Sequence, residues 1–248
     1  MTTEPNALPS HLHRPFTIAA IQAENCHTKT LVFCESLPAQ PGQFVMAWLP
    51  GVDEKPFSIA AAVPLALTVV AVGPFSEALH RLAVGDRVWA RGPLGQGYKV
   101  EGKRLLLAGG GYGVAPLLFL ARTAIAASCA AQVCIGARMA ADILLVDDFQ
   151  RAGASVRITT EDGSLGTKGL VTSATEAIIH DLRPDTVYAC GPIKMLEAID
   201  RQCEEHNLPR QLSWEAHMRC GIGLCGSCEL PSRSGWLTCL DGPVSFSR

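Results

Sequence analysis

The stretch Arg104-Leu105-Leu106-Leu107-Ala108-Gly109-Gly110-Gly111-Tyr112-Gly113-Val114-Ala115-Pro116 decides the fold of the second half of this chain. An uninterrupted apolar run predicts a buried strand, and the glycine run after it is a turn signal. Pro116 suits the first turn of a helix, where its missing N–H costs nothing. The stretch therefore predicts a strand, a glycine-rich turn and a helix.

Backbone N–H groups at such a helix start can hold phosphate, and glycines let a phosphate approach closely. A dinucleotide site is therefore predicted at Gly109, Gly110, Gly111 and Gly113. The pattern is not G-x-G-x-x-G, because proline stands in place of the third glycine. The alternative is a tight strand–helix turn that binds nothing.

Strands and helices continue to alternate along residues 101–208. Strands are expected at 104–108, 131–136, 155–160 and 186–189. Helices are expected up to about 127 and at 140–152, 170–180 and 193–206. This alternation predicts a doubly wound parallel α/β sheet.

The first part of the chain, residues 12–100, has short apolar runs divided by glycine and proline turns. Strands are expected at 17–22, 30–34, 43–49, 57–62, 67–72 and 86–90, with a short helix at 76–82. Many short strands of this kind predict an antiparallel β-barrel. The fold class is therefore α+β with several domains. Residues 1–11 show no pattern and are expected to be a disordered tail.

Two segments at strand ends complete the predicted NAD site. Ligands bind at the carboxyl ends of parallel strands, so Cys190 is expected to face the nicotinamide, and Gly191 and Pro192 are expected to belong to the same NAD site. Glu161 and Asp162 also follow a strand, where a carboxylate can bind a ribose 2′-OH and repel a 2′-phosphate. This favours NAD over NADP. A buried cysteine before a turn and an exposed acidic loop are the ordinary alternatives.

Four cysteines near the C-terminus, Cys220, Cys225, Cys228 and Cys239, read C-x4-C-x2-C-x10-C. The first three have the plant-type [2Fe–2S] spacing, and glycines between them allow the sharp turns that a cluster loop needs. A cluster module is therefore expected over residues 209–248. The alternatives are a structural zinc site, which usually has two C-x2-C knuckles, and disulfides.

The composition excludes some partners and compartments. A net charge of −2 gives no electrostatic basis for binding nucleic acid or a membrane surface. The N-terminal residues lack the basic and apolar regions of a signal peptide, and no apolar stretch is long enough to span a membrane. Ten cysteines without a disulfide pattern fit a reducing compartment, so a cytoplasmic location is expected.

One barrel segment, Glu54-Lys55-Pro56-Phe57-Ser58-Ile59-Ala60, combines a cation, a proline-fixed strand and a hydroxyl. It could bind a flavin, with Lys55 on a phosphate and Ser58 near the reactive ring nitrogen. A solvated lysine is the alternative.

The order of these motifs resembles one family. The segments K-P-F-S, G-P-L-G-Q-G-Y, A-G-G-G-Y-G-V-A-P, E-D-G-S-L-G-T-K-G and Y-A-C-G-P precede the cysteine set, which ends in Asp241-Gly242-Pro243-Val244. Over about residues 12–246 the chain is similar to the electron-transfer subunits of dihydroorotate dehydrogenase B, within the ferredoxin–NADP reductase superfamily. This resemblance implies an FAD barrel, an NAD domain and a [2Fe–2S] module ligated by the four cysteines.

The resemblance also implies an FAD site made by Lys55, Pro56, Phe57, Ser58, Thr68, Val69, Val70, Phe75 and Ser76. Two positions depart from the family pattern. Lys55 replaces an arginine, so a bidentate grip on the pyrophosphate becomes a point contact. Phe75-Ser76 replaces Gly-Thr, and the Phe75 ring would stack on the flavin or block a backbone approach.

By the same resemblance, the chain is an oxidoreductase subunit in pyrimidine biosynthesis. An FMN-containing catalytic subunit oxidises dihydroorotate, and the electrons pass through the cluster and FAD to NAD⁺. No residue of this chain need act as acid or base on orotate, because that chemistry belongs to the catalytic subunit. The assembly is expected to be a two-plus-two heterotetramer. The alternatives are a reductase subunit of a hydrogenase, a bifurcating transhydrogenase or another dehydrogenase, and a non-enzymatic zinc-bearing binding module.

Overall fold

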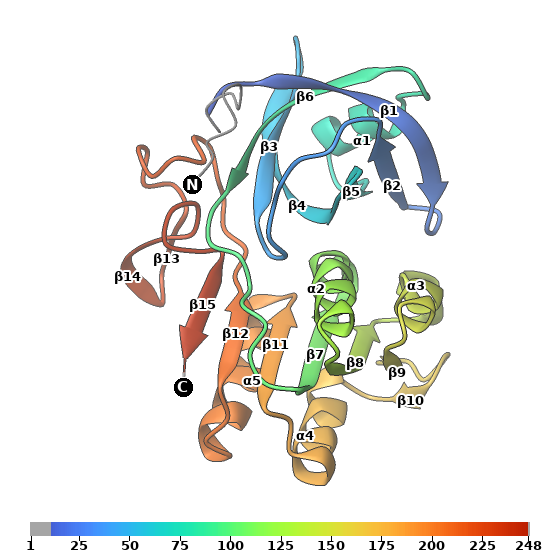
Figure 1. Ribbon diagram of the computed structural model, residues 1–248, viewed down its shortest axis with the longest axis vertical. Helices are drawn as coiled ribbons and strands as arrows, with labels where there is room; N and C mark the ends of the chain where they lie inside the picture. The colour runs from blue at the N-terminus through green and yellow to red at the C-terminus, as the bar shows by residue number, and fades with distance from the viewer. Residues whose placement is uncertain (1–10, 248) are drawn as a thin grey trace.

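A computed structural model describes residues 11–247 of the chain. It has a β-barrel, an α/β domain and a C-terminal segment, residues 214–243, that lies against both (Figure 1). This segment is called the excursion below. The disordered tail expected over residues 1–11 falls, except for residue 11, outside the described residues.

The barrel closes in the order β1-β2-β5-β4-β3-β6, with every neighbouring pair antiparallel. Its elements are β1 (Arg14–Ala23), β2 (Thr28–Phe33), β3 (Phe44–Leu49), β4 (Asp53–Ala62), β5 (Leu65–Val70), α1 (Pro74–His80) and β6 (Arg87–Leu94). Strand β4 begins four residues before the expected position 57. The chain turns back directly after β3, so Asp53 already pairs with Leu49 and Pro56 lies within the strand.

The second domain contains a seven-stranded sheet in the order β10-β9-β8-β7-β11-β12-β15. Its strands are β7 (Arg104–Gly110), β8 (Ala130–Ala137), β9 (Ser155–Thr160), β10 (Thr167–Lys168), β11 (Thr186–Cys190), β12 (Arg210–Ser213) and β15 (Val244–Ser247). All neighbours are parallel except β15, which pairs antiparallel with β12. The barrel followed by a parallel α/β sheet confirms the expected fold class.

Helices cover both faces of this sheet because the side chains of its strands alternate between two cores. Leu105 and Leu107 face the core under helices α2 (Val114–Ala126) and α3 (Val146–Arg151). Leu106 and Ala108 face the opposite core, under α4 (Val171–Leu182) and α5 (Ile193–Glu205). Over residues 11–247, no helix has both the length and the hydrophobicity to cross a membrane.

The helix expected at 140–152 is interrupted. The chain forms a short 3₁₀ turn, η2 (Ala140–Asp142), and then the separate helix α3. Leu145 between them has φ = 61°, a left-handed conformation that breaks a regular helix.

The sheet extends beyond residue 208, the expected end of the second domain, because β12 and β15 both belong to it. Ser213 faces Val244 in the register of this pair. Residues 214–243 therefore leave and rejoin the sheet at facing positions, and within them a small hairpin forms from β13 (Glu229–Leu230) and β14 (Arg233–Leu237). This excursion carries the four cysteines and packs on the barrel through a cluster of Phe44, Met46, Leu94, Met218, Cys228 and Cys239.

Candidate functional site

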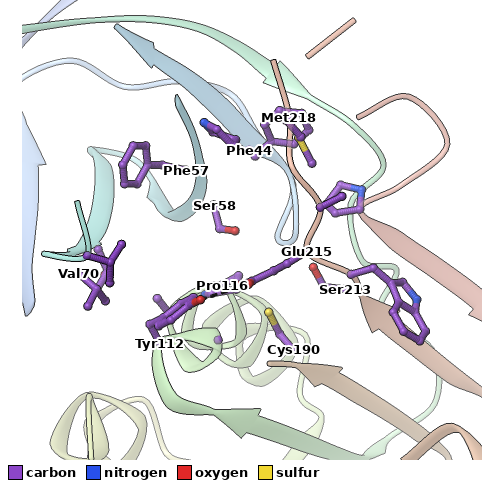
Figure 2. A pocket seen from close by; sticks show the side chains of 18 residues that line it. Phe44, Phe57, Ser58, Val70, Tyr112, Pro116, Cys190, Ser213, Glu215 and Met218 are labelled. Carbon is purple, nitrogen blue, oxygen red and sulfur yellow. Dashed lines mark hydrogen bonds between the residues drawn. The ribbon is translucent and has the colours of Figure 1, made fainter. Parts of the chain in front are cut away.

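A cavity of about 280 Å³, the junction cavity, lies where the three parts of the molecule meet. Its walls come from the barrel, from the start of α2, from the end of β11 and from the first residues of the excursion (Figure 2). Ser58 and Cys190 point into it from opposite sides. The structure therefore brings together two residues that are 132 positions apart and that the sequence assigned to the flavin and the nicotinamide.

Cys190 is a neutral thiol in this cavity. Burial raises its pKa to about 12, so it stays protonated near neutral pH. It can make a close, uncharged contact with a ring but does not present a thiolate nucleophile.

The predicted flavin residues on β5 divide between two faces. Thr68 and Val70 line the junction cavity, whereas the Val69 side chain is 1% exposed and packs in the barrel core. Period-2 alternation along a strand imposes this division. At Val69 only backbone atoms remain for a ligand, and its carbonyl oxygen is already 2.8 Å from His80 Nε2.

The Phe75 ring is turned away from both cavities. It is buried in the barrel core and lies 6.0 Å, centroid to centroid, from the ring of Phe57, which does line the junction cavity. The Phe75 ring therefore lines neither cavity, and the assignment of Phe75 to the flavin site stays a prediction. Ser76 fixes the start of α1: its Oγ accepts hydrogen bonds from the N–H groups of Val72 and Gly73 at 2.9 and 3.1 Å.

Lys55 does not line either cavity in the structure. Its ammonium pairs with the carboxylate of Asp53 at 2.5 Å on the barrel surface. A contact with a flavin phosphate therefore requires the lysine side chain to leave Asp53, which its flexible stem permits.

A second cavity of about 880 Å³, the cleft, adjoins the first between the barrel and the carboxyl ends of β7, β8 and β11. Five of the predicted NAD residues line it: Gly110, Gly111, Glu161, Gly191 and Pro192. Arg138, Asp142 and Lys194 also line it, although the sequence gave no separate signal for them.

Three other predicted NAD residues lie elsewhere. Gly113 lines the junction cavity. Gly109 packs against α2, where a Cβ would lie 2.5 Å from a Val114 methyl. Asp162 accepts hydrogen bonds from the backbone N–H and the hydroxyl of Ser164, so its carboxylate holds a turn instead of facing the cleft.

Glu215 and Tyr112 line both cavities, and sequence reasoning assigned neither. The Tyr112 hydroxyl donates a hydrogen bond to Glu215 Oε2 at 3.2 Å. Burial raises the pKa of Glu215, and burial together with the Glu215 charge raises that of Tyr112 to about 12. Glu215 follows the carboxyl end of β12, so the strand-end rule would have found it had β12 been recognised.

The four cysteines lie in two neighbouring pairs. Cys228 and Cys239 have sulfurs 3.3 Å apart, and hydrogen bonds from Ser227 and Cys220 lower the pKa of Cys225 to about 6. All ten cysteines are free thiols, so the disulfide alternative is wrong.

Backbone N–H groups point at the sulfurs of this loop, from Gly223 to Cys239 at 3.1 Å and from Leu224 to Cys220 at 3.3 Å. Within residues 11–247, no three His, Cys, Asp or Glu side chains converge as around a single metal ion. Two thiol pairs with N–H donors fit a two-iron cluster better than one tetrahedral zinc.

Two family models match the chain. Residues 215–247 match the iron-sulfur cluster binding domain of dihydroorotate dehydrogenase B, and residues 107–201 match an oxidoreductase NAD-binding domain. A probable electron transfer subunit of dihydroorotate dehydrogenase B (NAD(+)) from Thermococcus kodakarensis is 40% identical over 233 residues, which cover 94% of this chain and 96% of the relative.

The chain belongs to the family of dihydroorotate dehydrogenase B electron-transfer subunits.

Other comparisons agree with this membership. A Pyrococcus abyssi member of the family is 43% identical over 214 residues, covering 86% of this chain and 81% of the relative. The solved structure of an NADH-dependent reduced ferredoxin–NADP oxidoreductase has a TM-score of 0.83 and 27% identity, covering 98% of this chain and 90% of that one. This chain is therefore an oxidoreductase subunit of the electron-transfer type, with an iron-sulfur cluster binding domain and an NAD-binding domain, and its fold is shared with a flavin-based oxidoreductase.

Proposed function

We propose that the chain carries electrons between the FMN-containing catalytic subunit of a dihydroorotate dehydrogenase B and NAD, with the flavin ring held in the junction cavity. One observation carries this proposal: the walls of that cavity come from the barrel, the NAD domain and the cysteine-bearing excursion together. When bound, FAD exchanges hydride with NAD and single electrons with the cluster. The chain itself binds these groups, orients them and excludes water.

Named residues have distinct tasks in this arrangement. Ser58 offers a hydroxyl and Cys190 a neutral thiol on opposite sides of the cavity. The N–H groups of Gly110 and Gly111, at the carboxyl end of β7, suit a pyrophosphate. Glu161, in the same cleft, suits a ribose 2′-OH and disfavours a 2′-phosphate.

The catalytic subunit is proposed to dock over the cysteine loop. Three exposed apolar side chains, Ile222, Leu224 and Leu240, surround the cysteines there, and Leu224 is 81% exposed. Exposed large apolar side chains gathered in one short loop region are typical of a protein interface. A two-plus-two heterotetramer in the cytoplasm is part of the same proposal, and ten free thiols support a reducing compartment.

The test is an anaerobic visible spectrum of the purified chain, titrated with NADH. Flavin and cluster absorbance should bleach together. In Cys225→Ser the cluster absorbance should disappear while NADH-to-dye activity through the flavin is largely kept. Cys34→Ser, an exposed cysteine on the barrel, is the matched control and should keep both. Loss of dye activity from Cys225→Ser with FAD still bound contradicts the proposed electron path.

A second candidate function is supported by the solved relative of TM-score 0.83, an NADH-dependent reduced ferredoxin–NADP oxidoreductase. The same chain architecture would then serve a different dehydrogenase. Purification of the native complex separates the two: an FMN-containing partner that oxidises dihydroorotate supports the first, and a partner without that activity supports the second.

A further inference from the structure

A buried arginine joins the barrel to the cysteine loop. Arg91 on β6 has a side chain only 8% exposed. Its Nε and Nη2 donate to the two carboxylate oxygens of Glu54 on β4, at 2.6 and 3.1 Å. Nη2 also donates to the backbone carbonyl of Cys220 at 2.7 Å. One guanidinium thus binds a barrel carboxylate and the peptide group of the first cysteine of the set.

This contact lies where the loop docks on the barrel. Met46 on β3 is the register partner of Arg91 on β6. Gly221, the residue after Cys220, sits directly on Met46, because a Cβ at Gly221 would lie 2.8 Å from Met46 Cγ. Gly221 has φ = +67°, so the chain turns sharply at the docking point. The apolar contact and the guanidinium hydrogen bond therefore hold the same peptide.

The pair is charged. An arginine side chain stays protonated in proteins. Burial opposes ionisation of Glu54, but hydrogen bonds from Arg91 and His13 outweigh it, so the pKa of Glu54 is lowered. A bidentate carboxylate fixes the plane of the guanidinium and thereby the direction of its remaining N–H groups. Glu54 therefore aims Arg91 at the Cys220 carbonyl.

The charge also bears on the redox properties of the loop. Net charge, hydrogen bonds and burial around a cluster set its reduction potential. A cation beside a ligand peptide favours the reduced state, which carries one more negative charge, and a nearby carboxylate offsets that effect. Arg91 and Glu54 consequently act in opposite directions.

We propose that Arg91, held in place by Glu54, is a positioning residue that fixes the Cys220 peptide against the FAD barrel and raises the reduction potential of the cluster. This inference rests on the proposed assignment of the four cysteines as cluster ligands.

The experiment is an EPR-monitored redox titration of the holo chain, comparing Arg91→Met, Glu54→Gln and the wild type. Arg91→Met removes the cation and should lower the equilibrium constant for one-electron reduction at least tenfold, which is about 59 mV for one electron. Glu54→Gln leaves the guanidinium without its counter-charge and should shift the potential upward. If Arg91 and Glu54 only stabilised the fold, the two variants would not be expected to shift the reduction potential in opposite directions.

Two further variants complete the design. Arg91→Lys keeps the charge but loses the planar fork, so its potential should stay closer to wild type than that of Arg91→Met while its EPR lines broaden. Arg87→Met is the matched control, because Arg87 is an exposed arginine on the same strand. It should leave the potential unchanged.

Each outcome decides the inference. Shifts of opposite sign for Arg91→Met and Glu54→Gln support it. Shifts of the same sign, or a potential in either variant equal to that of Arg87→Met, overturn it. If Arg91→Met does not retain its cofactors, Glu54→Gln decides alone, since only an upward shift is consistent. A wild-type chain without any EPR-active cluster contradicts the cysteine assignment itself, which is a distinguishable result.

Discussion

Replacing Gly113 with alanine should push apart two segments that form the junction cavity. Gly113 has φ = −61° and ψ = −9°, so alanine fits the backbone conformation there. A Cβ would nevertheless lie 2.6 Å from the carbonyl carbon of Cys190 and 2.8 Å from the nitrogen of Gly191, well inside the ordinary contact distance of 3.4 Å. Both neighbours are backbone atoms at the end of a buried strand and cannot rotate away.

The expected cost follows from two opposing effects. Overpacking typically costs about 1–3 kcal/mol. Alanine also has less conformational freedom than glycine in the unfolded chain, and this stabilises the folded state by about 0.4–1 kcal/mol. Gly113→Ala should therefore lower the free energy of unfolding by about 1–2 kcal/mol. Displacement of Cys190 should also lower kcat/KM for NADH with a dye acceptor, by about tenfold or more, because small misplacements at a reacting centre are costly.

Urea unfolding and steady-state kinetics at fixed FAD occupancy measure the two effects. Gly153→Ala is the control: Gly153 has φ = +94°, so alanine is strained there, but it lines neither cavity. It should lose stability while keeping kcat/KM. If Gly113→Ala changes stability by less than 0.5 kcal/mol and kcat/KM by less than twofold, the close approach of the two segments is not as tight as described.

Three other predictions concern the pH response and the core. The Arg104 guanidinium and the backbone N–H groups of Lys103 and Arg104 bind Asp185 and hold the pKa of its carboxyl well below the usual value, so Asp185→Asn should be less stable at neutral pH. The pKa of Asp185 is lower in the folded than in the unfolded chain, so the loss in free energy of unfolding should be constant above about pH 5 and should shrink as the pH falls below about 4. Urea titrations at several pH values measure this loss, and a loss that does not depend on pH contradicts the prediction. Phe75→Ala should cost about 3–5 kcal/mol by leaving a cavity in the barrel core, and a cost below 1 kcal/mol in urea unfolding would place the ring elsewhere. Glu215→Gln should move the pKa of Tyr112 down from about 12, because a neighbouring negative charge is removed, and ultraviolet titration of the three tyrosines should show one of them shifting.

The architecture was predictable because its signals are local. The apolar strand before Gly109 and the alternation after it are properties of short windows of sequence, and so is the spacing of the cysteines. Segments whose structure depends on pairing with another strand were missed or misplaced. The strand expected to begin at residue 57 already includes Pro56, because the chain turns back directly after β3 and Asp53 pairs with Leu49. The β12 strand is only four residues long and is recognisable mainly through its pairing with β11 and β15.

The same reasoning explains which site residues were found. Ser58 and Cys190, which line the junction cavity, could be singled out because each stands in a recognisable motif at a strand. Arg91 was not, because its partners are 37 and 129 positions away and nothing around it in sequence marks it. Val69 and Phe75 were assigned to the ligand by motif position, but the sequence does not show that their side chains turn into the barrel.

The facing positions of Ser213 and Val244 have a consequence for how this chain can change. The cysteine-bearing segment is joined to the sheet like the turn of a very long hairpin, so its two ends stay in place whatever lies between them. Insertions or deletions within residues 214–243 leave the strand register intact. A different metal-binding sequence could therefore be joined to the same two strands, provided that it also covers Phe44, Met46 and Leu94 on the barrel and keeps the wall that this segment contributes to the junction cavity.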